Sequence, residues 1–450
     1  MTATQTPGRS ALLAALHAAL ARVDAERSVS RAFDEDASGL AESAPASVHV
    51  LALGKAAAPM ARAACARLGG AAARGLVLTK DGHGAGFDVW PVIESAHPVP
   101  DARSAEAGRR ALAFAADMPE GDRLLVLLSG GTSALVATPV EGLALEDLAR
   151  TSSLLLGSGA PIEEMNVVRK RLAAVSAGRL SAAASRASRV DVWIVSDVVG
   201  DDPGTIASGP CHADASGFEA ALGILERRGV MDALPPRVRA HLEAGVASRR
   251  SDSPLPGDPV FERVRTKLVA RNRDALDAAA ASLGESGARV VSLGDRVTGE
   301  ARERGAQWAA LARSIAGVTR ERGPIALVGG GETTVRLGDD PGDGGRNQEL
   351  ALAAALALEE GAGGRDEHGS EIALLAAGTD GTDGPTDAAG GLVDVHSAER
   401  MRAAGADPGR GLLRHDAYPV LDAAGDLVRT GPTGTNVMDL TLVWIGPEAH

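Results

Sequence analysis

Short runs of apolar residues, each followed at once by glycine or polar residues, constrain this fold most strongly. Five such runs are VHVLALG (48–54), LLVLLSG (124–130), VDVWIVSD (190–197), PIALVGG (324–330) and EIALLAAG (371–378). Longer Ala- and Leu-rich segments of helical composition separate them. Strands that are apolar at every position are buried on both faces, and intervening helices indicate a parallel sheet covered on both sides. The pattern therefore predicts an α/β fold.

The apolar runs fall into two series, which indicates two α/β domains. The first series also contains strands expected at 74–80 and 89–96 and helices at 56–68, 103–116, 144–157 and 163–186. This alternation is typical of a doubly wound, Rossmann-like sheet, which we place in residues 1–250. A Pro-rich stretch then opens a linker and helical connection at 251–285.

The second series starts at ARVVSLG (288–294) and predicts a smaller α/β domain over residues 286–450. It continues through helices at 299–316 and 346–360, a hairpin at 333–339, an exposed loop at 361–369 and a closing strand at 438–446. In open α/β sheets, ligands bind at the carboxyl ends of the strands. The glycine-rich loops that follow the strands are therefore the candidate functional segments.

Charge and composition exclude several classes of protein. The 450 residues carry a net charge of −13, whereas a general nucleic-acid binder is usually basic. Cys65 and Cys211 form no CxxC pair and no zinc-binding spacing, which fits buried thiols in a reducing compartment. No clear cleavage site follows the N-terminal stretch 1–20, and Arg9, His17 and Arg22 lie at helical spacing, so we expect an amphipathic helix and not a signal peptide. No apolar run reaches about 18 residues, so we expect a cytoplasmic protein without nucleic-acid or membrane partners.

Because the chain is acidic, an anion site needs a local cluster of cations and backbone N–H groups. Lys55 stands between a strand and a helix N-terminus, which carries a partial positive charge. The Walker A pattern is absent. A surface lysine without a ligand at such a turn would fit the sequence equally well. In a second loop, two glycines let the backbone approach an anion and three hydroxyls add donors, although N-capping hydroxyls need no ligand. This loop consists of Ser129, Gly130, Gly131, Thr132 and Ser133.

Two further segments of the first series carry charge. Asn166, Arg169 and Lys170 share one face of a predicted helix, either as ligands or as a solvated cationic face. Asp197 closes an apolar strand, where a carboxylate can hold Mg²⁺ or accept a proton from a substrate hydroxyl. The two aspartates before Pro203 are also compatible with a role as turn residues that bind no ligand.

The second series repeats the arrangement. Gly330 and Gly331 belong to a triple glycine after a strand, which strand packing alone explains poorly, and Glu332 follows them. Arg346 opens a helix, where a cation opposes the helix dipole, so a carboxylate or phosphate ligand is favoured. The Asp- and Gly-rich segment 377–387 suits Mg²⁺, a ribose or simple turns, and its candidates are Asp380 and Asp383. Loops of this kind in two α/β domains indicate a phosphoryl-transfer cleft, because that chemistry needs positioning and charge neutralisation.

With these segments in view, the sequence resembles the class II glycerate kinases, the glycerate 2-kinase family whose C-terminal domain is called MOFRL. The matching stretches span nearly the whole chain in order: GKAA (54–57), ESAHPVPDARS (94–104), LLSGGTSAL (127–135), EEMNVVRKRLAAVSAGRL (163–180), SDVVGDDPGTIASGP (196–210), VGGGETTV (328–335), GGRNQELAL (344–352), AAGTDGTDGPTDAAGG (376–391) and GPTGTNVMDLTLV (431–443). The family's KGGRLA reads SAGRLS at 176–181, a small departure that affects only what this helix end contacts.

The resemblance implies ATP- and Mg²⁺-dependent phosphorylation of D-glycerate at its 2-hydroxyl, which gives 2-phosphoglycerate and ADP. It also implies a Rossmann-like N-terminal domain, a smaller α/β MOFRL domain and an active site in the cleft between them. Lys55 and Arg346 match the family's pair of cleft cations, and Asp197 and Glu332 match its acidic positions.

On this basis we expect Lys55 and Arg346 to hold the glycerate carboxylate and the transferring phosphate from opposite sides of the cleft. Asp197 is expected to orient the 2-hydroxyl proton, and Glu332, Asp380 and Asp383 to hold Mg²⁺. The ATP-binding set is Ser129, Gly130, Gly131, Thr132, Ser133, Gly330, Gly331, Asn166 and Lys170.

Two alternatives stay open at this point, together with the oligomeric state, for which a homodimer is one candidate. Some members of the family carry the name hydroxypyruvate reductase, an NAD(P)H-dependent enzyme, although no GxGxxG fingerprint follows a strand here. A sugar-phosphate- or nucleotide-binding regulator would bind without turnover, although no basic helix-turn-helix segment is present.

Overall fold

The computed structural model describes residues 6–36, 39–40, 47–69, 72–248, 253–319, 323–338, 340–360 and 370–447. The chain divides into two compact units. The first unit comprises Ala25–Ser196 and Asp201–Val269, and the second comprises Met1–Asp24, Asp197–Gly200 and Ala270–His450. Each unit contains one six-stranded sheet with helices, which confirms the predicted α/β class.

The sheet of the first unit has the strand order β3-β2-β1-β4-β5-β6. The strands are β1 (Val48–Leu53), β2 (Ala72–Lys80), β3 (Val92–Ser95), β4 (Arg123–Leu128), β5 (Arg189–Val195) and β6 (Val264–Ala270). The pairs from β3 to β5 are all parallel, and every residue of β1 is buried, as the continuous apolar runs predict. The carboxyl ends of β1, β4 and β5 therefore lie at one edge of this sheet.

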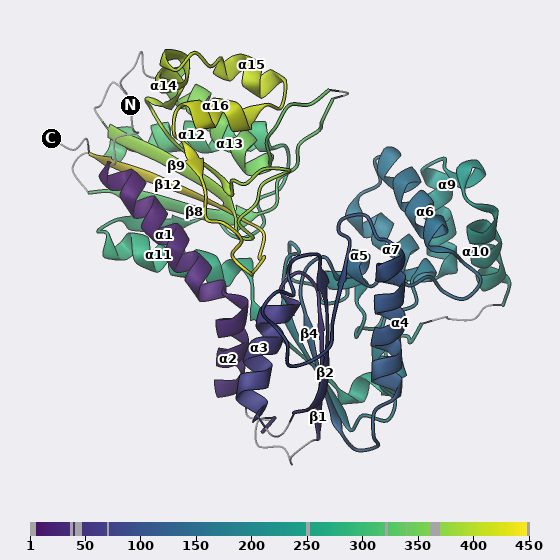
Figure 1. The fold of residues 1–450 in the computed structure, drawn as a ribbon. Coiled ribbons are helices and arrows are strands. Elements are labelled where there is room, and N and C mark those ends of the chain that lie inside the picture. Colours follow the sequence, from purple (N-terminus) through teal and green to yellow (C-terminus); the bar gives the residue numbers. More distant parts are fainter. Residues whose placement is uncertain are drawn as a thin grey trace. The chain divides into compact units, whose positions relative to one another are not determined.

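Helices connect and cover these strands (Figure 1). They are α2 (Ala25–Asp34), α3 (Ala57–Leu68), α4 (Ala102–Ala116), α5 (Thr132–Leu135), α6 (Leu145–Gly157), α7 (Ile162–Leu172), α8 (Arg179–Ala183), α9 (Phe218–Arg227) and α10 (Pro236–Ser248). Short 3₁₀ turns lie at Ile206–Ser208, Met231–Ala233 and Pro259–Arg263. Helices α6, α7, α9 and α10 share an apolar core of their own, which includes Leu155, Val168, Leu225 and Leu242.

The single helix predicted at 163–186 is wrong, because the chain breaks between α7 and α8. Ala177 and Gly178 have positive φ angles of 56° and 77°, which a helix cannot accommodate. Their N–H groups donate to the carbonyls of Ser208 and Gly209 at 3.0 and 2.8 Å. Hydrogen bonds to a segment about thirty residues away thus replace the local helical bonds, which sequence periodicity does not reveal.

The sheet of the second unit has the order β11-β10-β9-β12-β8-β7. Its strands are β7 (Arg289–Ser292), β8 (Ile325–Gly331), β9 (Ser370–Gly378), β10 (Gly390–Asp394), β11 (Leu427–Val428) and β12 (Asp439–Pro447). Strands β7 and β8 are parallel, whereas β12 runs antiparallel to both β8 and β9. Asp439, at the start of β12, consequently lies opposite Gly331 and Gly378, at the edge where β7, β8 and β9 end.

Helices cover both faces of the second sheet. One face carries α12 (Ala301–Thr319) and α13 (Arg346–Glu360), and the other carries α1 (Pro7–Val23) and α11 (Asn272–Glu285) (Figure 1). The remaining helices of this unit are α14 (Ser397–Ala403), α15 (Pro408–Leu413) and α16 (Ala417–Ala423). The predicted hairpin at 333–339 is wrong, since Thr334 instead bridges to Glu300 in parallel. The predicted loop at 361–369 and residue 339 lie outside the described residues.

The expected domain boundaries differ from the structure at both ends of the first domain. The segment expected as a linker and helical connection, 251–285, contains β6, which joins the first sheet, and α11, which packs on β8 of the second. Helix α1 packs on α11, β9 and β12, so the chain begins in the second unit and returns to it after β6. These pairings join segments far apart in sequence, which is why local composition does not predict them.

A buried ionic network fixes α1 to the second unit. Arg9 is 5% exposed and pairs with Asp394 at 2.6 Å and with Asp426 at 2.9 Å. Arg400 contacts the same two carboxylates at 2.9 Å each. The expectation that Arg9 lies on the polar face of an amphipathic helix is therefore wrong. Within the ranges described above, no helix is long and apolar enough to span a membrane.

Candidate active site

The loops after β1 and β4 of the first unit are joined by hydrogen bonds. The Lys55 N–H donates to the Gly130 carbonyl at 2.9 Å, and the Ala56 N–H donates to Ser129 Oγ at 3.0 Å. Gly54 has a φ of 113°, and any side chain there would overlap Ser129. Glycine is therefore required at this position, and the two predicted loops form one structure at the sheet edge.

The Lys55 side chain lies against the second glycine of the β4 loop. Gly131 has a φ of 83°, and a Cβ built on it would lie 3.2 Å from Lys55 Cγ and 3.1 Å from the His97 ring. The Thr132 hydroxyl donates to the Ser129 carbonyl at 2.7 Å, so it serves the turn itself. Sequence reasoning missed His97 as a neighbour of this turn, although it lies within the ESAHPVPDARS stretch.

Ser133 and Asn166, both predicted binding residues, belong to one chain of polar contacts. Ser133 Oγ lies 3.0 Å from Ser208 Oγ, and Ser208 Oγ donates to Asn166 Oδ1 at 3.3 Å. Arg169 Nη1 donates to the same Asn166 oxygen at 3.0 Å. Burial lowers the pKa of Arg169 below its ordinary value. The fold thus brings together side chains from α5, α7 and the turn at 206–208.

Lys170, which we expected to bind ATP, is instead held in a buried ion pair. It is 9% exposed, and its Nζ donates to Asp214 Oδ1 at 3.1 Å. Arg171 pairs with the same carboxylate. The charge of Lys170 is therefore already balanced by the protein.

Asp202 is a turn residue, which is one of the roles that the sequence allowed. Its carboxylate accepts a hydrogen bond from Thr205 Oγ1 at 2.7 Å.

Asp197 follows the carboxyl end of β5, at the sheet edge where β1 and β4 also end. It is half-buried, whereas the preceding Ser196 is fully buried. By its contacts, the segment Asp197–Gly200 groups with the second unit. The predicted position of Asp197 after a strand is thus confirmed. Its role in orienting the substrate hydroxyl stays a prediction.

In the second unit, Arg346 is held by carboxylates from two strands. Its Nε and Nη2 contact the two oxygens of Asp439 at 2.5 and 3.0 Å, and its Nη1 contacts Glu332 Oε1 at 2.7 Å. Burial opposes the charge, but Asp439 and Glu332 outweigh it and raise the pKa of Arg346. The guanidinium is therefore a fixed cation at the start of α13. Sequence reasoning missed Asp439, although a carboxylate next to an apolar strand was the signal used for Asp197.

The triple glycine of β8 is explained by packing, contrary to expectation. A side chain at Gly330 would overlap Asn272, and one at Gly331 would overlap the backbone of Val297. Gly331 also has a φ of 143°, which favours glycine. Gly330 and Gly331 thus shape the sheet edge that carries Glu332, and their expected role in binding ATP stays a prediction.

Asp383 caps α13, whereas we expected it to hold Mg²⁺. Its Oδ1 accepts from the Asn347 N–H at 3.1 Å, and its Oδ2 accepts from the Gln348 N–H at 2.8 Å. A side chain at Gly345 would overlap this carboxyl group, so the GGR sequence makes room for it. Burial raises the pKa of Asp383 to about 6, although these hydrogen bonds oppose the shift.

We expect Asp383→Asn to change how stability depends on pH. The folded-state pKa of about 6 lies above the ordinary 3.8, so the folded protein binds this proton more tightly than the unfolded chain does. The resulting stability is fully present below the unfolded-state pKa and is lost as the pH rises through the folded-state pKa. Since asparagine does not titrate, the variant should lose less stability than the parent between about pH 5 and about pH 7.5. Urea unfolding at both pH values measures this, with the exposed Asp277→Asn as control; equal losses in parent and variant would contradict it.

Three oxygen atoms surround the position above Gly378, at the end of β9. A Cβ built there would lie 3.0 Å from the Thr382 carbonyl oxygen and 3.5 Å from the Oδ1 atoms of Asp380 and Asp439. Asp380 Oδ1 also accepts from the Thr382 N–H at 3.1 Å. Hard oxygen donors of this kind suit Mg²⁺, which is commonly bound by one or two carboxylates and substrate phosphates. Across the described ranges, no three His, Cys, Asp or Glu side chains form a ready metal-binding group.

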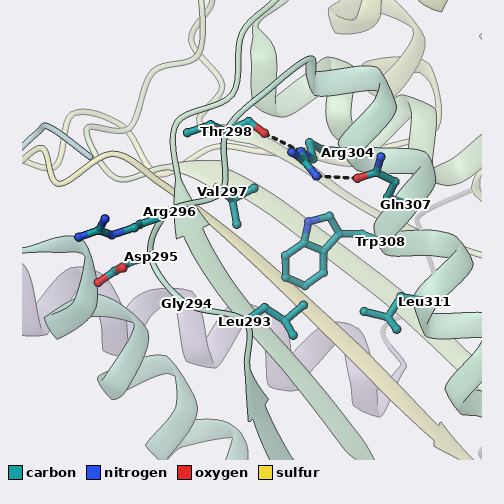
Figure 2. A pocket seen from close by; sticks show the side chains of 10 residues that line it. All are labelled: Leu293, Gly294, Asp295, Arg296, Val297, Thr298, Arg304, Gln307, Trp308 and Leu311. Atoms are coloured by element: carbon teal, nitrogen blue, oxygen red, sulfur yellow. Dashed lines mark hydrogen bonds between the residues drawn. The ribbon is translucent and has the colours of Figure 1, made fainter. Parts of the chain in front are cut away.

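A pocket of about 470 Å³ lies between the β7–α12 loop and α12. Figure 2 shows the Trp308 ring with Leu293 and Leu311 beside it, whereas Arg304 bonds to Thr298 and Gln307. The pocket adjoins the sheet edge, because the Gly330 N–H donates to the Gly294 carbonyl and the Glu332 N–H donates to the Val297 carbonyl, both at 2.9 Å. No predicted site residue lines it.

Known proteins match this chain over nearly its full length. Residues 11–243 match a family described as a domain of unknown function, DUF4147, and residues 325–439 match the MOFRL family. A D-glycerate 2-kinase from Thermotoga maritima is 41% identical over 88% of this chain and 90% of its own. The chain belongs to the glycerate 2-kinase family with a MOFRL domain.

Two further comparisons bear on this glycerate 2-kinase family member. The crystal structure of a Thermotoga maritima glycerate kinase superposes with a TM-score of 0.83 at 37% identity, covering 97% of this chain and 99% of that one. A protein from Agrobacterium vitis with the provisional name hydroxypyruvate reductase is 40% identical over 88% of this chain and 87% of its own. The kinase names of the curated relatives and of the solved structure support a kinase, whereas the reductase name is provisional.

Proposed function

We propose that this protein transfers the terminal phosphoryl group of ATP to the 2-hydroxyl of D-glycerate, giving 2-phosphoglycerate and ADP. The observation that carries the proposal is the 41% identity to a D-glycerate 2-kinase over 88% of the chain. The geometry agrees with phosphoryl transfer, which depends on positioning and charge neutralisation. Lys55 follows β1 in a glycine-rich loop, and Arg346 opens α13 after two glycines and contacts Glu332 and Asp439.

In this proposal Lys55 and Arg346 neutralise the carboxylate and the transferring phosphate. Support for Lys55 comes from its place beside Gly131, where the β4 loop turns sharply. Support for Arg346 comes from Asp439 and Glu332, which fix the plane of its guanidinium. Asp197 would orient the substrate hydroxyl, and its position after β5 is consistent with that role. We also propose that residues of both units serve one reaction. Kinetic measurements on variants of Lys55 in the first unit and of Arg346 in the second test this.

Mg²⁺ is the metal that we propose for this reaction. The oxygens near Gly378 fit it, so Asp380 and Asp439 would hold the ion with Glu332 nearby, while Asp383 remains the cap of α13. When bound, Mg²⁺ would neutralise charge on the phosphate oxygens. Asp439 would then both orient Arg346 and contribute an oxygen at this edge of the sheet.

The decisive experiment is a coupled ADP-release assay with D-glycerate, ATP and Mg²⁺. We expect ADP release that depends on D-glycerate and stops when Mg²⁺ is chelated. Phosphorus NMR of the product should place the phosphate on the 2-position, and a signal from the 3-position would correct the regiochemistry. NADH oxidation with hydroxypyruvate and no ADP release would favour the reductase instead, and binding without either turnover would favour a regulator.

The remaining expectations concern the setting of the enzyme. We propose ATP as the phosphate donor and the cytoplasm as the location, supported by the kinase names of the relatives. The composition, with two cysteines that the structure shows as free thiols, agrees with a reducing compartment. We also propose a homodimer, which light scattering of the purified protein would test.

A further inference from the structure

Arg169, in the first unit, is paired with no carboxylate of the described residues. Helix α7 carries three consecutive cations, and two of them, Lys170 and Arg171, share Asp214. Arg169, in contrast, is partly buried and makes its hydrogen bond to the neutral oxygen of Asn166. Among the residues that the structure describes, Arg169 takes part in no ion pair. Burying a charge without a counter-charge is costly, so this arrangement is expected where a ligand supplies the opposite charge.

Neutral side chains form a chain of hydrogen bonds that ends at Arg169. Asn166 Oδ1 accepts from both Arg169 and Ser208, which turns the Asn166 amide so that its NH₂ group faces away from them. The Ser133 hydroxyl lies 3.0 Å from that of Ser208 and remains partly exposed, whereas Ser208 and Asn166 are buried. Because Ser208 gives its hydrogen to Asn166, Ser133 donates to Ser208 in the free protein, and its partly exposed hydroxyl is free to turn toward a ligand. The remaining N–H groups of the guanidinium and this hydroxyl match the oxygens of a small oxyanion.

The backbone holds these groups in a fixed arrangement. Ala207 and Ser208 have φ angles of 55° and 60°, a region that non-glycine residues rarely occupy. The Ser208 carbonyl accepts from the Ala177 N–H at 3.0 Å, which secures the turn to the segment after α7. Such conformations are strained and persist where the surroundings enforce them. Ser133 is two residues beyond Gly131, so the group adjoins the turn beside Lys55.

We propose that Arg169, Asn166, Ser133 and Ser208 form an oxyanion-binding site in the first unit. Its ligand is a carboxylate or a phosphate group, and the naming of D-glycerate and ATP as the sources rests on the proposed function. Arg169 supplies the charge, the Ser133 hydroxyl supplies a neutral donor, and Asn166 and Ser208 hold the guanidinium in position. The site assigns to Arg169 the binding role that the sequence suggested for Lys170.

The first experiment measures binding without turnover. Inorganic phosphate, D-glycerate and ATP are titrated separately into the full-length parent protein, Arg169→Met and Ser133→Ala by calorimetry. We expect Arg169→Met to weaken one of these ligands by roughly 10- to 100-fold, the range for a lost charge-assisted hydrogen bond, and Ser133→Ala to weaken the same ligand less. Arg169→Lys, which keeps the charge, should recover part of the affinity. Arg227→Met is the matched control, since Arg227 is exposed and only loosely paired with Glu164.

The second experiment identifies the source of the oxyanion. A KM for D-glycerate that rises while the KM for ATP is unchanged assigns the site to the carboxylate, and the reverse assigns it to a nucleotide phosphate. If the parent protein lacks kinase activity, the proposed function fails, whereas the calorimetric arms still test the site. Unchanged affinities for all three ligands in a folded Arg169→Met protein would overturn the inference. Should that variant unfold, unchanged affinities in Ser133→Ala would overturn it equally.

Discussion

Replacing Lys55 or Arg346 with alanine should lower kcat by roughly 10²- to 10³-fold, because removing one preorganised charge partner from a transition state costs about 3–4 kcal/mol. The Lys55 side chain lies beside the Gly131 turn, and Arg346 is fixed by Asp439 and Glu332. Arg346→Ala also leaves the buried Asp439 without its guanidinium, so kcat is compared at a temperature at which each variant is fully folded. The coupled ADP-release assay at saturating D-glycerate and ATP measures it.

Matched controls separate this effect from a general loss of charge. Lys267→Ala removes an ammonium from the first unit that pairs with the exposed Glu35, and Arg336→Ala removes a guanidinium that is 94% exposed in the second. Exposed pairs are worth about 0–1 kcal/mol, so both controls should retain parental kcat. Thermal unfolding of each variant checks that the fold is intact. Near-parental turnover in both Lys55→Ala and Arg346→Ala would overturn the assignment of the two cations.

Replacing Arg9 with methionine should destabilise the second unit by about 3–5 kcal/mol, the usual cost of removing one partner from a buried ionic network. Asp394 and Asp426 would then share the single charge of Arg400, although Asp426 is completely buried. Burial already raises the pKa of Asp426 despite the two arginines, which shows how little water reaches it. Urea unfolding measures the loss, and hydrogen exchange over α1 and β10 localises it.

Arg22→Met on the same helix is the control, because Arg22 is 40% exposed and lies 3.6 Å from Asp274. Its removal should cost about 1 kcal/mol or less. If Arg9→Met and Arg22→Met unfold at the same urea concentration, the buried network does not anchor α1. Exchange that accelerates in the first unit and not in α1 would contradict the proposed location of the effect.

The class of fold follows from local sequence, because it depends on patterns within about ten residues. Continuous apolar runs place β1, β4, β5, β8 and β9 within two residues of their observed bounds. The start of α13 at Arg346 matches as well, since a glycine pair precedes it. Strand β6 was missed because VRTKLVA contains three consecutive polar residues, and only its carboxyl end is buried.

The roles of individual residues could be predicted less well from the sequence than the fold class, because these roles depend on partners far along the chain. Lys170 and Arg169 are neighbours on one helix, yet Asp214 balances the first and not the second. Asp383 resembled a metal ligand because its segment is rich in aspartate, but the N-terminus of α13 comes to lie against it. Asp439 went unnoticed because nothing near it in sequence indicates Arg346, 93 residues away.

The sequence by itself determined that two α/β sheets end in glycine-rich loops and that Lys55 and Arg346 stand at those loops. Its continuous likeness to one enzyme family also indicated the chemistry. Only the tertiary structure decided that α1 joins the second unit, that Asp439 orients Arg346, and that Arg169 bonds to Asn166 and to no carboxylate in the described part of the chain. The physical reason is that the environment of a charge depends on groups within a few ångströms, and folding, not sequence distance, selects those groups.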